Sequence, residues 1–199
     1  MTIAPGISPG IAAAAAFGLA ALVALSPAPA TAQIKFIDEV KAGGLVHDIT
    51  FSTTQVESGA DINLEMLFTP LFTPVDVWGV GVSLRPHLGG ALNTNGDTSK
   101  GYFGLTLDMV LVRDLFRPGD GIFLDGSLGG AIHDGFLTNA PPGRKNLGAR
   151  FLGRRAGELG YQVTPQISVS VIIDHVGNYG FAKPDAGLKT LGGRVGFKF

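Results

Sequence analysis

The residue best placed to do chemistry is a histidine near the C-terminal end of the chain, in the stretch QISVSVIIDHVGN. If this stretch is a strand, its alternation puts His175 on the apolar face with Ile173 and Val171. Asp174 then lies on the opposite face. Imidazole exchanges protons near neutral pH and so serves as a general base. A histidine at the end of an apolar strand is also commonly an interfacial polar residue, and position alone leaves both interpretations open.

Three further histidines, His47, His87 and His133, are dispersed along the chain. His47 and His133 are each followed by an aspartate. Neighbouring residues on a strand point to opposite faces, so such a pair does not chelate one ion. We therefore interpret them as polar residues at strand ends and expect neither a metal site nor a cofactor. The chain has no cysteine, which excludes thiolate metal sites and disulfides.

The elements that carry these residues are segments in which apolar and polar residues alternate with period two. In the clearest of them, Phe103, Leu105 and Leu107 alternate with polar neighbours. Eight such segments lie near 44–53, 60–69, 76–87, 101–113, 121–133, 148–161, 166–176 and 188–199. None has a convincing helical period, and alternation over about ten residues is typical of a tilted membrane strand.

The connections differ between the two ends of these segments. Those after the second, fourth and sixth segments are short and contain proline, whereas those after the third, fifth and seventh are longer and polar or rich in glycine. This asymmetry is typical of outer-membrane barrels, with short periplasmic turns and long extracellular loops. The terminal Phe199 also resembles the signal by which such barrels are recognised for insertion. We therefore predict an all-β fold, an eight-stranded antiparallel outer-membrane β-barrel with a filled interior.

A soluble lipocalin-like barrel is the alternative, because it alternates equally well but keeps its apolar face inside. Polar sets such as Asp61, Asn63 and Glu65 fit a polar interior and a solvated exterior alike. A second set, Arg150, Arg154 and Glu158, behaves in the same way. The asymmetry of the connections and the terminal phenylalanine favour the membrane barrel.

Residues 1–32 predict a secretory signal peptide, with an apolar stretch at Ile11 to Leu25 and an A-x-A cleavage site at Ala30 to Ala32. The n-region has no lysine or arginine, so an uncleaved anchor is the alternative. Residues 33–199 then form one transmembrane barrel domain in the outer membrane of a Gram-negative bacterium. The formal net charge is −1 and no basic run is present, so nothing suggests a nucleic-acid partner.

The segment DHVGNYGFAKPDAGLKTLGGRVGF resembles the C-terminal signature of the lipid A 3-O-deacylases, the PagL-type family, also called acyloxyacyl hydrolases. The matching positions are His175, Asn178, Gly180, Pro184 and Gly187. A looser similarity, at 46–48, 85–99 and 129–135, is typical of the branch common in alphaproteobacteria.

The resemblance implies a hydrolase that removes an ester-linked acyl chain from lipid A, the membrane anchor of lipopolysaccharide. His175 would act as base for a serine two residues later, oriented by a carboxylate from the next strand. Asn178 and Gly180 would belong to the oxyanion hole.

Two of the implied catalytic positions differ from the family pattern. Gly177 stands at the position of the nucleophilic serine, and Lys189 at the position of the orienting acid. Glycine has no hydroxyl, and a cation opposes the imidazolium that base catalysis forms. Thr190 faces the wrong way to substitute, while Tyr179 lies in the loop and can approach, although a phenol is a poor substitute.

Two functions follow from these residues. The first is a lipid A deacylase with His175 as base, attacking through water if no hydroxyl replaces the serine. The second, favoured by Gly177 and Lys189, is a catalytically silent member that binds lipopolysaccharide or is structural. Arg144, Lys145 and Lys183 are candidates for contacts with lipid A phosphates, with solvated loop charges as the alternative.

Overall fold

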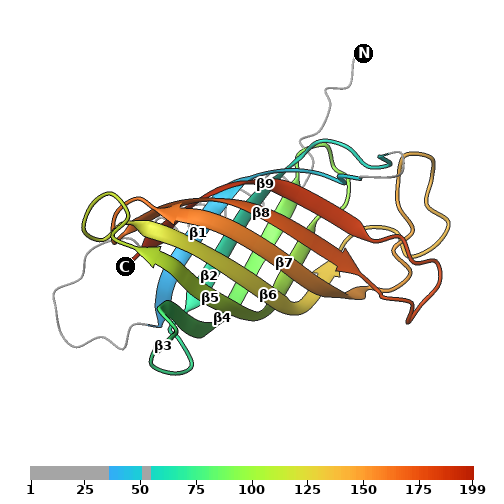
Figure 1. Ribbon diagram of the computed structural model, residues 1–199. Coiled ribbons are helices and arrows are strands. Elements are labelled where there is room, and N and C mark those ends of the chain that lie inside the picture. The colour runs from blue at the N-terminus through green and yellow to red at the C-terminus, as the bar shows by residue number, and fades with distance from the viewer. Residues whose placement is uncertain (1–35, 51–54) are drawn as a thin grey trace, which may run out of the picture. The chain divides into compact units, whose positions relative to one another are not determined.

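The computed structural model describes residues 36–50 and 55–199, and the predicted signal peptide lies outside these residues. The described chain is built from strands joined by turns and loops (Figure 1). The strands are β1 (Ile37–Val46), β2 (Ala60–Phe68), β3 (Val75–Val77), β4 (Val80–Asn93), β5 (Lys100–Arg113), β6 (Gly121–His133), β7 (Phe151–Gln162), β8 (Ile167–Gly177) and β9 (Leu188–Lys198).

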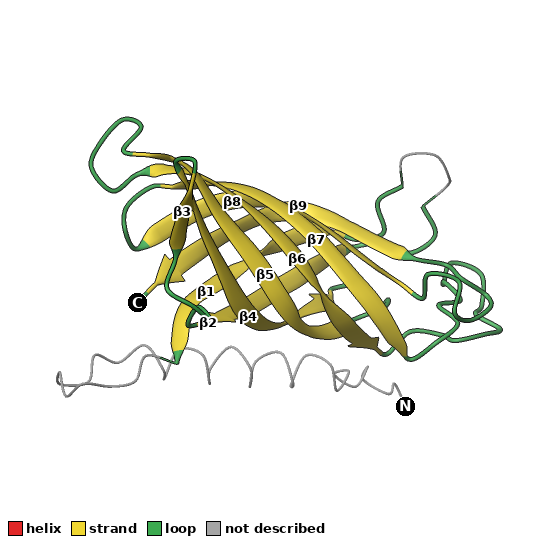
Figure 2. Cartoon of the chain, turned by 60° about the horizontal axis from the view of Figure 1, so that its bottom comes forward, coloured by secondary structure: helices red, strands yellow, loops and turns green. Residues whose placement is uncertain are grey.

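Eight of these strands close into a barrel, as predicted. Each pairs antiparallel with its neighbours in the order β2-β1-β9-β8-β7-β6-β5-β4, and pairing of β2 with β4 closes the ring (Figure 2). The short β3 pairs with β4 alone and lies outside the ring. Closure gives every barrel strand two partners, so that no edge is left unpaired.

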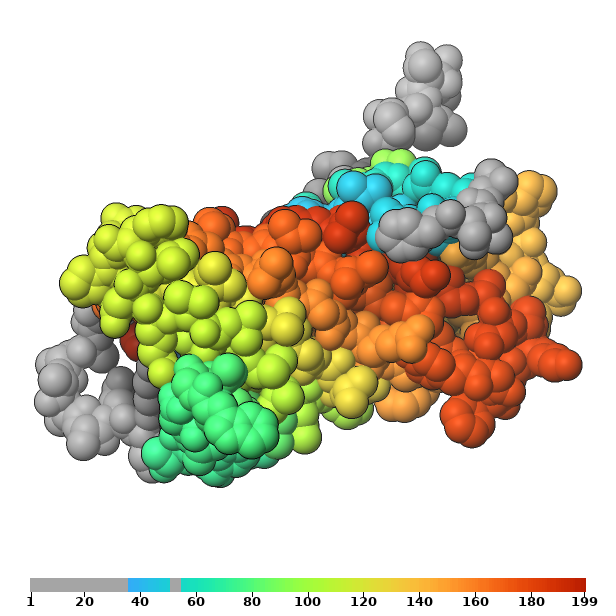
Figure 3. Space-filling model, in the orientation of Figure 1, coloured from blue at the N-terminus to red at the C-terminus, as the bar shows by residue number. Residues whose placement is uncertain are grey.

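The two ends of the barrel are distinct. We call the end formed by the connections 47–59, 94–99, 134–150 and 178–187 the loop end, and the end formed by 69–79, 114–120 and 163–166 the turn end. In Figure 3 the red-orange segment 178–187 projects from the loop end, and the green β3–β4 hairpin from the turn end. Both ends of the barrel domain, Ile37 and Lys198, lie at the turn end because the number of barrel strands is even.

The outer wall of the barrel is apolar and the interior is polar. Large exposed side chains such as Leu128, Val171 and Val195 point outwards. Charged residues of the same strands, such as Asp125, Asp174 and Arg194, are buried inside. A lipocalin-like barrel has the reverse arrangement, so the orientation excludes that alternative and matches a membrane barrel. No helix in the described residues is long and apolar enough to cross a membrane.

A lattice of ion pairs fills the middle of the interior. Arg194 bridges Glu65, at 3.2 Å, and Glu158. Lys41 pairs with Asp125 at 2.8 Å and with Glu158 at 3.2 Å. Buried charges are tolerated when they are paired and hydrogen-bonded, and removal of one partner leaves the other uncompensated. The lattice therefore fills the middle of the interior with paired charged side chains.

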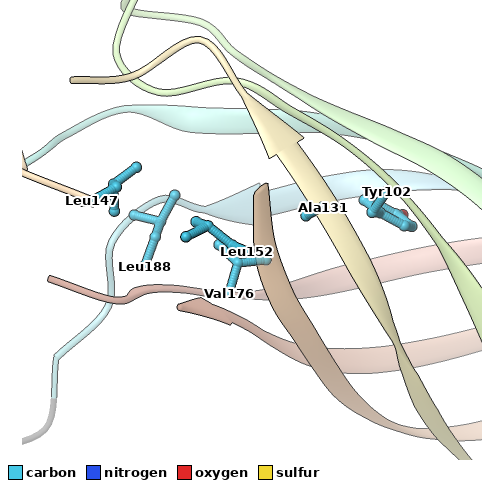
Figure 4. Close-up of a cluster of buried hydrophobic side chains, with 6 residues drawn as sticks. All are labelled: Tyr102, Ala131, Leu147, Leu152, Val176 and Leu188. Atoms are coloured by element: carbon cyan, nitrogen blue, oxygen red, sulfur yellow. The ribbon is translucent and has the colours of Figure 1, made fainter. Parts of the chain in front are cut away.

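An apolar cluster occupies the interior near the loop end. Leu147, from the long connection 134–150, inserts among side chains of β7, β8 and β9 (Figure 4). The cluster consists of Tyr102, Ala131, Leu147, Leu152, Val176 and Leu188. Because Leu147 is buried while its segment is a loop, this contact fixes the loop over the mouth of the barrel.

The first strand differs from the prediction. We expected it near 44–53, but β1 spans Ile37–Val46, and 51–54 lie outside the described residues. The outward residues of β1 include Ala42 and Gly44, which give little apolar signal, and its inward residues Glu39 and Lys41 belong to the ion-pair network. The inward side chains of β1 pair with charges on distant strands, and such long-range pairing is not visible in a local alternation pattern.

The third predicted segment, 76–87, contains a turn and ends too early. Trp78 and Gly79 have φ values of 53° and 87° and connect β3 to β4. Positive φ at both central residues is the requirement of a type I′ hairpin, which glycine meets readily and tryptophan rarely. Arg150 is also misplaced, because it lies exposed before β7 and donates to the His133 carbonyl at 2.7 Å.

Candidate functional site

His175 lies on the outer wall near the loop end, on the face that the sequence predicted. Along β8, Val171 and Ile173 are exposed and His175 is half-buried, while Asp174 is buried inside the barrel. Asp174 pairs there with Lys100 and Arg154, so its carboxylate does not reach the imidazole face. Asp174, although adjacent in sequence, therefore does not orient the imidazole of His175.

The Nδ1 atom of His175 lies 3.4 Å from the Tyr179 hydroxyl. The two rings meet edge to face, with centroids 5.7 Å apart and an interplanar angle of 77°. Tyr179 has a φ of 53°, a left-handed conformation that folds the start of the loop back over the wall. The structure thus brings Tyr179 to the histidine, as the sequence allowed.

Two glycines border the other ring nitrogen. A Cβ atom added at Gly177 would lie 3.3 Å from Cε1 and 3.5 Å from Nε2 of His175. A Cβ atom added at Gly187 would lie 2.6 Å from Nε2. Position 177 therefore accepts a small side chain after a slight shift of the ring, whereas position 187 does not. Nε2 faces the position at which the resemblance expects a hydroxyl.

His175 is flanked on both sides by cations. The strand register pairs it with Arg155 of β7 and with Lys189 of β9. Lys189 lies beside the histidine as predicted. Arg155 was not predicted from the sequence, although counting back through the connection 163–166 pairs it with His175.

The predicted oxyanion residues are engaged with each other and with the loops. The Asn178 side chain donates to the carbonyls of Leu147, at 3.1 Å, and Pro184, at 3.0 Å. Its oxygen accepts from the Gly180 backbone N–H at 3.0 Å. Asn178 is buried, so in this arrangement it joins the connections 134–150 and 178–187. A role in stabilising an oxyanion would require these groups to leave their present partners.

Two of the three predicted phosphate ligands are paired within the loops. Arg144 donates to Glu57 at 3.3 Å, and Lys145 binds Asp48 and the Gly187 carbonyl, the latter at 2.9 Å. Lys183 is exposed on the connection 178–187. The structure therefore does not bring the three cations together at one site.

Glu57 is the centre of a buried hydrogen-bonded group at the loop end, which sequence analysis did not identify. It accepts from Thr98 and from the Lys145 backbone N–H at 2.9 Å, and it lies 3.0 Å from His47 Nε2. The other ring nitrogen of His47 lies 2.7 Å from Asp61. Each ring nitrogen of His47 therefore lies within hydrogen-bond distance of a different carboxylate, which favours the protonated imidazolium. Only the HD pair at His47 marks this group in the sequence, because its partners are distant in the chain.

The pKa values in this group shift in opposite directions. Burial alone would lower the pKa of His47, but its hydrogen bonds to Asp61 and Glu57 raise it from 6.5 to about 9. Burial would likewise raise the pKa of Glu57, yet hydrogen bonds from His47, Lys145 and Thr98 lower it from 4.5 to about 2. His47 therefore stabilises the loop end fully below about pH 6.5 and loses this contribution as pH rises through about 9. Glu57 contributes above about pH 4.5 and loses its contribution as pH falls towards 2.

We expect amide hydrogen exchange in residues 55–59 and in the connection 94–99 to accelerate between pH 7 and pH 10. The acceleration should exceed the known rise of the intrinsic exchange rate with pH. The physical reason is loss of the His47 proton and of its two charge-assisted hydrogen bonds. A His47→Gln variant should exchange faster at pH 7 and show no excess acceleration. An equal excess in both proteins would contradict this assignment.

Two hollows in the described structure lie away from His175. One, of about 230 Å³, is at the turn end and is lined by Asp120, Phe123 and Lys198 among others. The second, of about 420 Å³, is an open depression in the outer wall formed by Leu159, Tyr161 and neighbouring apolar residues of β6 to β8. His175 lines neither of these two hollows.

Comparisons with known proteins find a matching family model and a solved barrel of similar fold. A family model described as Lipid A 3-O-deacylase (PagL) matches residues 74–198. A crystal structure of the outer membrane enzyme PagL superposes with a TM-score of 0.65 and 16% sequence identity, covering 81% of this chain and 99% of that one. The backbone structure of the outer membrane protein Ail of Yersinia pestis, in a phospholipid bilayer nanodisc, gives a TM-score of 0.42 and 11% identity, covering 82% of this chain and 99% of that one. No curated protein matched the chain.

Proposed function

Because this chain belongs to the Lipid A 3-O-deacylase (PagL) family, we propose that it is an outer-membrane barrel that binds lipid A on its outer wall and does not cleave it by the serine route. The observation that carries the proposal is the charge around His175. Arg155 and Lys189 flank the ring, and Gly177 occupies the place of the nucleophile. The site therefore keeps a histidine that could act as a base, but it lacks the nucleophilic serine and the orienting carboxylate of the serine mechanism.

The apolar outer wall supports a location in the outer membrane. In that membrane the loop end faces the exterior, because outer-membrane barrels have long extracellular loops. His175 near the end of β8 then lies at the level of the outer leaflet, where lipid A is found. Residues 1–32 would direct export as a cleaved signal peptide.

Serine-histidine catalysis requires an attacking hydroxyl and a stabilised imidazolium. The serine oxygen attacks the ester carbonyl while histidine accepts its proton, and a carboxylate orients the ring and stabilises the charge. At His175 the cross-strand neighbours are cations, which oppose that charge. Among the described residues, the Tyr179 hydroxyl lies 3.4 Å from Nδ1, but a phenol is a weak nucleophile for esters near neutral pH.

Hydrolysis by water is the second candidate, because Nε2 of His175 has no hydrogen-bond partner among the described residues. Nε2 lies next to Gly177 and Gly187, and a water molecule bound to it would attack an ester carbonyl presented from the lipid side. His175 would take one proton from this water as it attacks the carbonyl, and would return the proton to the leaving alcohol. Without a carboxylate partner this reaction is slow.

Mass spectrometry of lipid A separates the two candidates. We expect identical lipid A profiles from cells that lack the protein, cells that express it and cells that express the His175→Ala variant. Retention of the heat-modifiable gel shift would demonstrate that both proteins are folded. Loss of one hydroxyacyl chain that requires His175 would instead establish hydrolysis and overturn the silent assignment.

A further inference from the structure

We infer that Arg155, His175 and Lys189 form an anion-binding row on the outer wall that holds a phosphate group of lipid A. This inference rests on the proposed function and names the chemical group that the wall recognises. It assigns to Arg155 and Lys189 the contact with phosphate that sequence analysis expected of loop residues.

The register places the three side chains in one row. Arg155 pairs with His175, and His175 pairs with Lys189, across the adjacent strands β7, β8 and β9. Neighbouring strands lie about 4.8 Å apart, so the two cations start roughly 10 Å from each other with the imidazole between them. The residues next to them in sequence, such as Arg154 and Thr190, are buried inside, so the row itself faces outwards.

The positive charge of the row is not balanced within the described protein. The next residues on the same face are Gly153 and Gly157 on β7, Ile173 on β8 and Leu191 on β9, none of which is charged. By contrast, interior cations such as Lys41 and Arg194 have carboxylate partners. An unpaired cation against hydrocarbon is costly, so the row belongs at headgroup level with an anion supplied by the lipid.

The ring of Tyr179 helps to position Arg155 for binding a phosphate. Tyr179 lies over Gly153, where an added Cβ would be 2.6 Å from its ring. The Arg155 guanidinium is 5.6 Å from the centroid of the Tyr179 ring. This contact limits the freedom of the arginine, and a guanidinium binds phosphate through two parallel hydrogen bonds. On the lipid side of the row Arg155 is exposed and His175 and Lys189 are partly exposed, so the oxygens of a phosphate would approach from that side.

Lipid binding to the full-length barrel in detergent micelles tests the row without requiring turnover. The probes are bisphosphorylated lipid A, the same lipid A after removal of both phosphates, and phosphatidylglycerol, each titrated in native mass spectrometry. We expect bisphosphorylated lipid A to bind at least about tenfold more tightly than the other two, since only its phosphates make charge-assisted hydrogen bonds to the row; tenfold corresponds to about 1.4 kcal/mol.

Variants test whether Arg155 and Lys189 cause the preference for bisphosphorylated lipid A. Arg155→Gln/Lys189→Gln should lose the preference for phosphate, and the charge-conserving Arg155→Lys/Lys189→Arg should retain it. Arg113→Gln/Arg117→Gln removes the same charge from the turn end and should leave binding unchanged. Each variant must show the heat-modifiable gel shift of the folded barrel.

The outcomes separate this inference from the proposed function. Equal binding of lipid A with and without phosphates would overturn the row and leave lipid A binding intact. Equal binding of phosphatidylglycerol would overturn the assignment to lipid A. No binding of any lipid would overturn both proposals.

Discussion

A Gly177→Ser/Lys189→Glu variant should remove an acyl chain from lipid A, whereas the unaltered protein should not. The Cβ atom at position 177 would lie 3.5 Å from His175 Nε2, so a serine hydroxyl comes within hydrogen-bond reach. A glutamate at 189 would stand beside the ring in the strand register and replace a cation that opposes the imidazolium. Loss of a nucleophile in a serine hydrolase reduces turnover by about 10⁶-fold, so even partial recovery is measurable.

Mass spectrometry of lipid A after incubation with the purified variants provides the measurement. The Gly177→Ser single variant should be weaker than the double variant, and Gly177→Ala/Lys189→Glu should be inactive. Adding His175→Ala to the double variant should abolish the reaction. A folded double variant that binds lipid A but leaves its esters intact would contradict the view that the rest of the site is retained.

An Arg194→Met variant should be less stable than the parent barrel by about 3–5 kcal/mol, because it leaves buried carboxylates uncompensated. Arg194 bridges Glu65 and Glu158, and Glu158 also receives Lys41. Urea titration in lipid vesicles, followed by the heat-modifiable gel shift, measures the change. Val195→Ala, one residue away on the outward face, is the matched control and should shift the midpoint little.

A second substitution tests the reason for that loss. Arg194→Met/Glu158→Gln removes one of the stranded negative charges and should recover part of the stability. An unchanged midpoint in Arg194→Met would contradict the assignment of the lattice as a structural core. No recovery in the double variant would show that Glu158 does not carry the penalty.

The alternation of residues predicted the barrel, its strand number and the outward direction of His175. Alternation is a local property, and this fold exposes one face of each strand to a single environment. The first strand was not predicted because its charged residues, Glu39 and Lys41, point inwards, and two of its outward residues, Ala42 and Gly44, are small. The turn at Trp78 was not predicted because no sequence pattern indicates a tryptophan with a positive φ.

The site was predicted in part. His175 and Lys189 were placed side by side, since both lie near one end of the last two strands. Arg155 belongs to a different strand, and its proximity depends on exact register through the connection 163–166. The group around Glu57 joins loops far apart in sequence, which no pattern of spacing reveals.

The position of His175 on the outer wall also determines how the proposed ligand reaches it. Because the histidine faces the leaflet and not the interior, a lipid would meet it by lateral diffusion within its own leaflet. Encounter is then a two-dimensional process, governed by the mole fraction of the lipid in the leaflet and not by its concentration in solution. At such surface densities a weak contact is occupied much of the time by exchanging lipids, so the proposed row would not need a deep pocket to work.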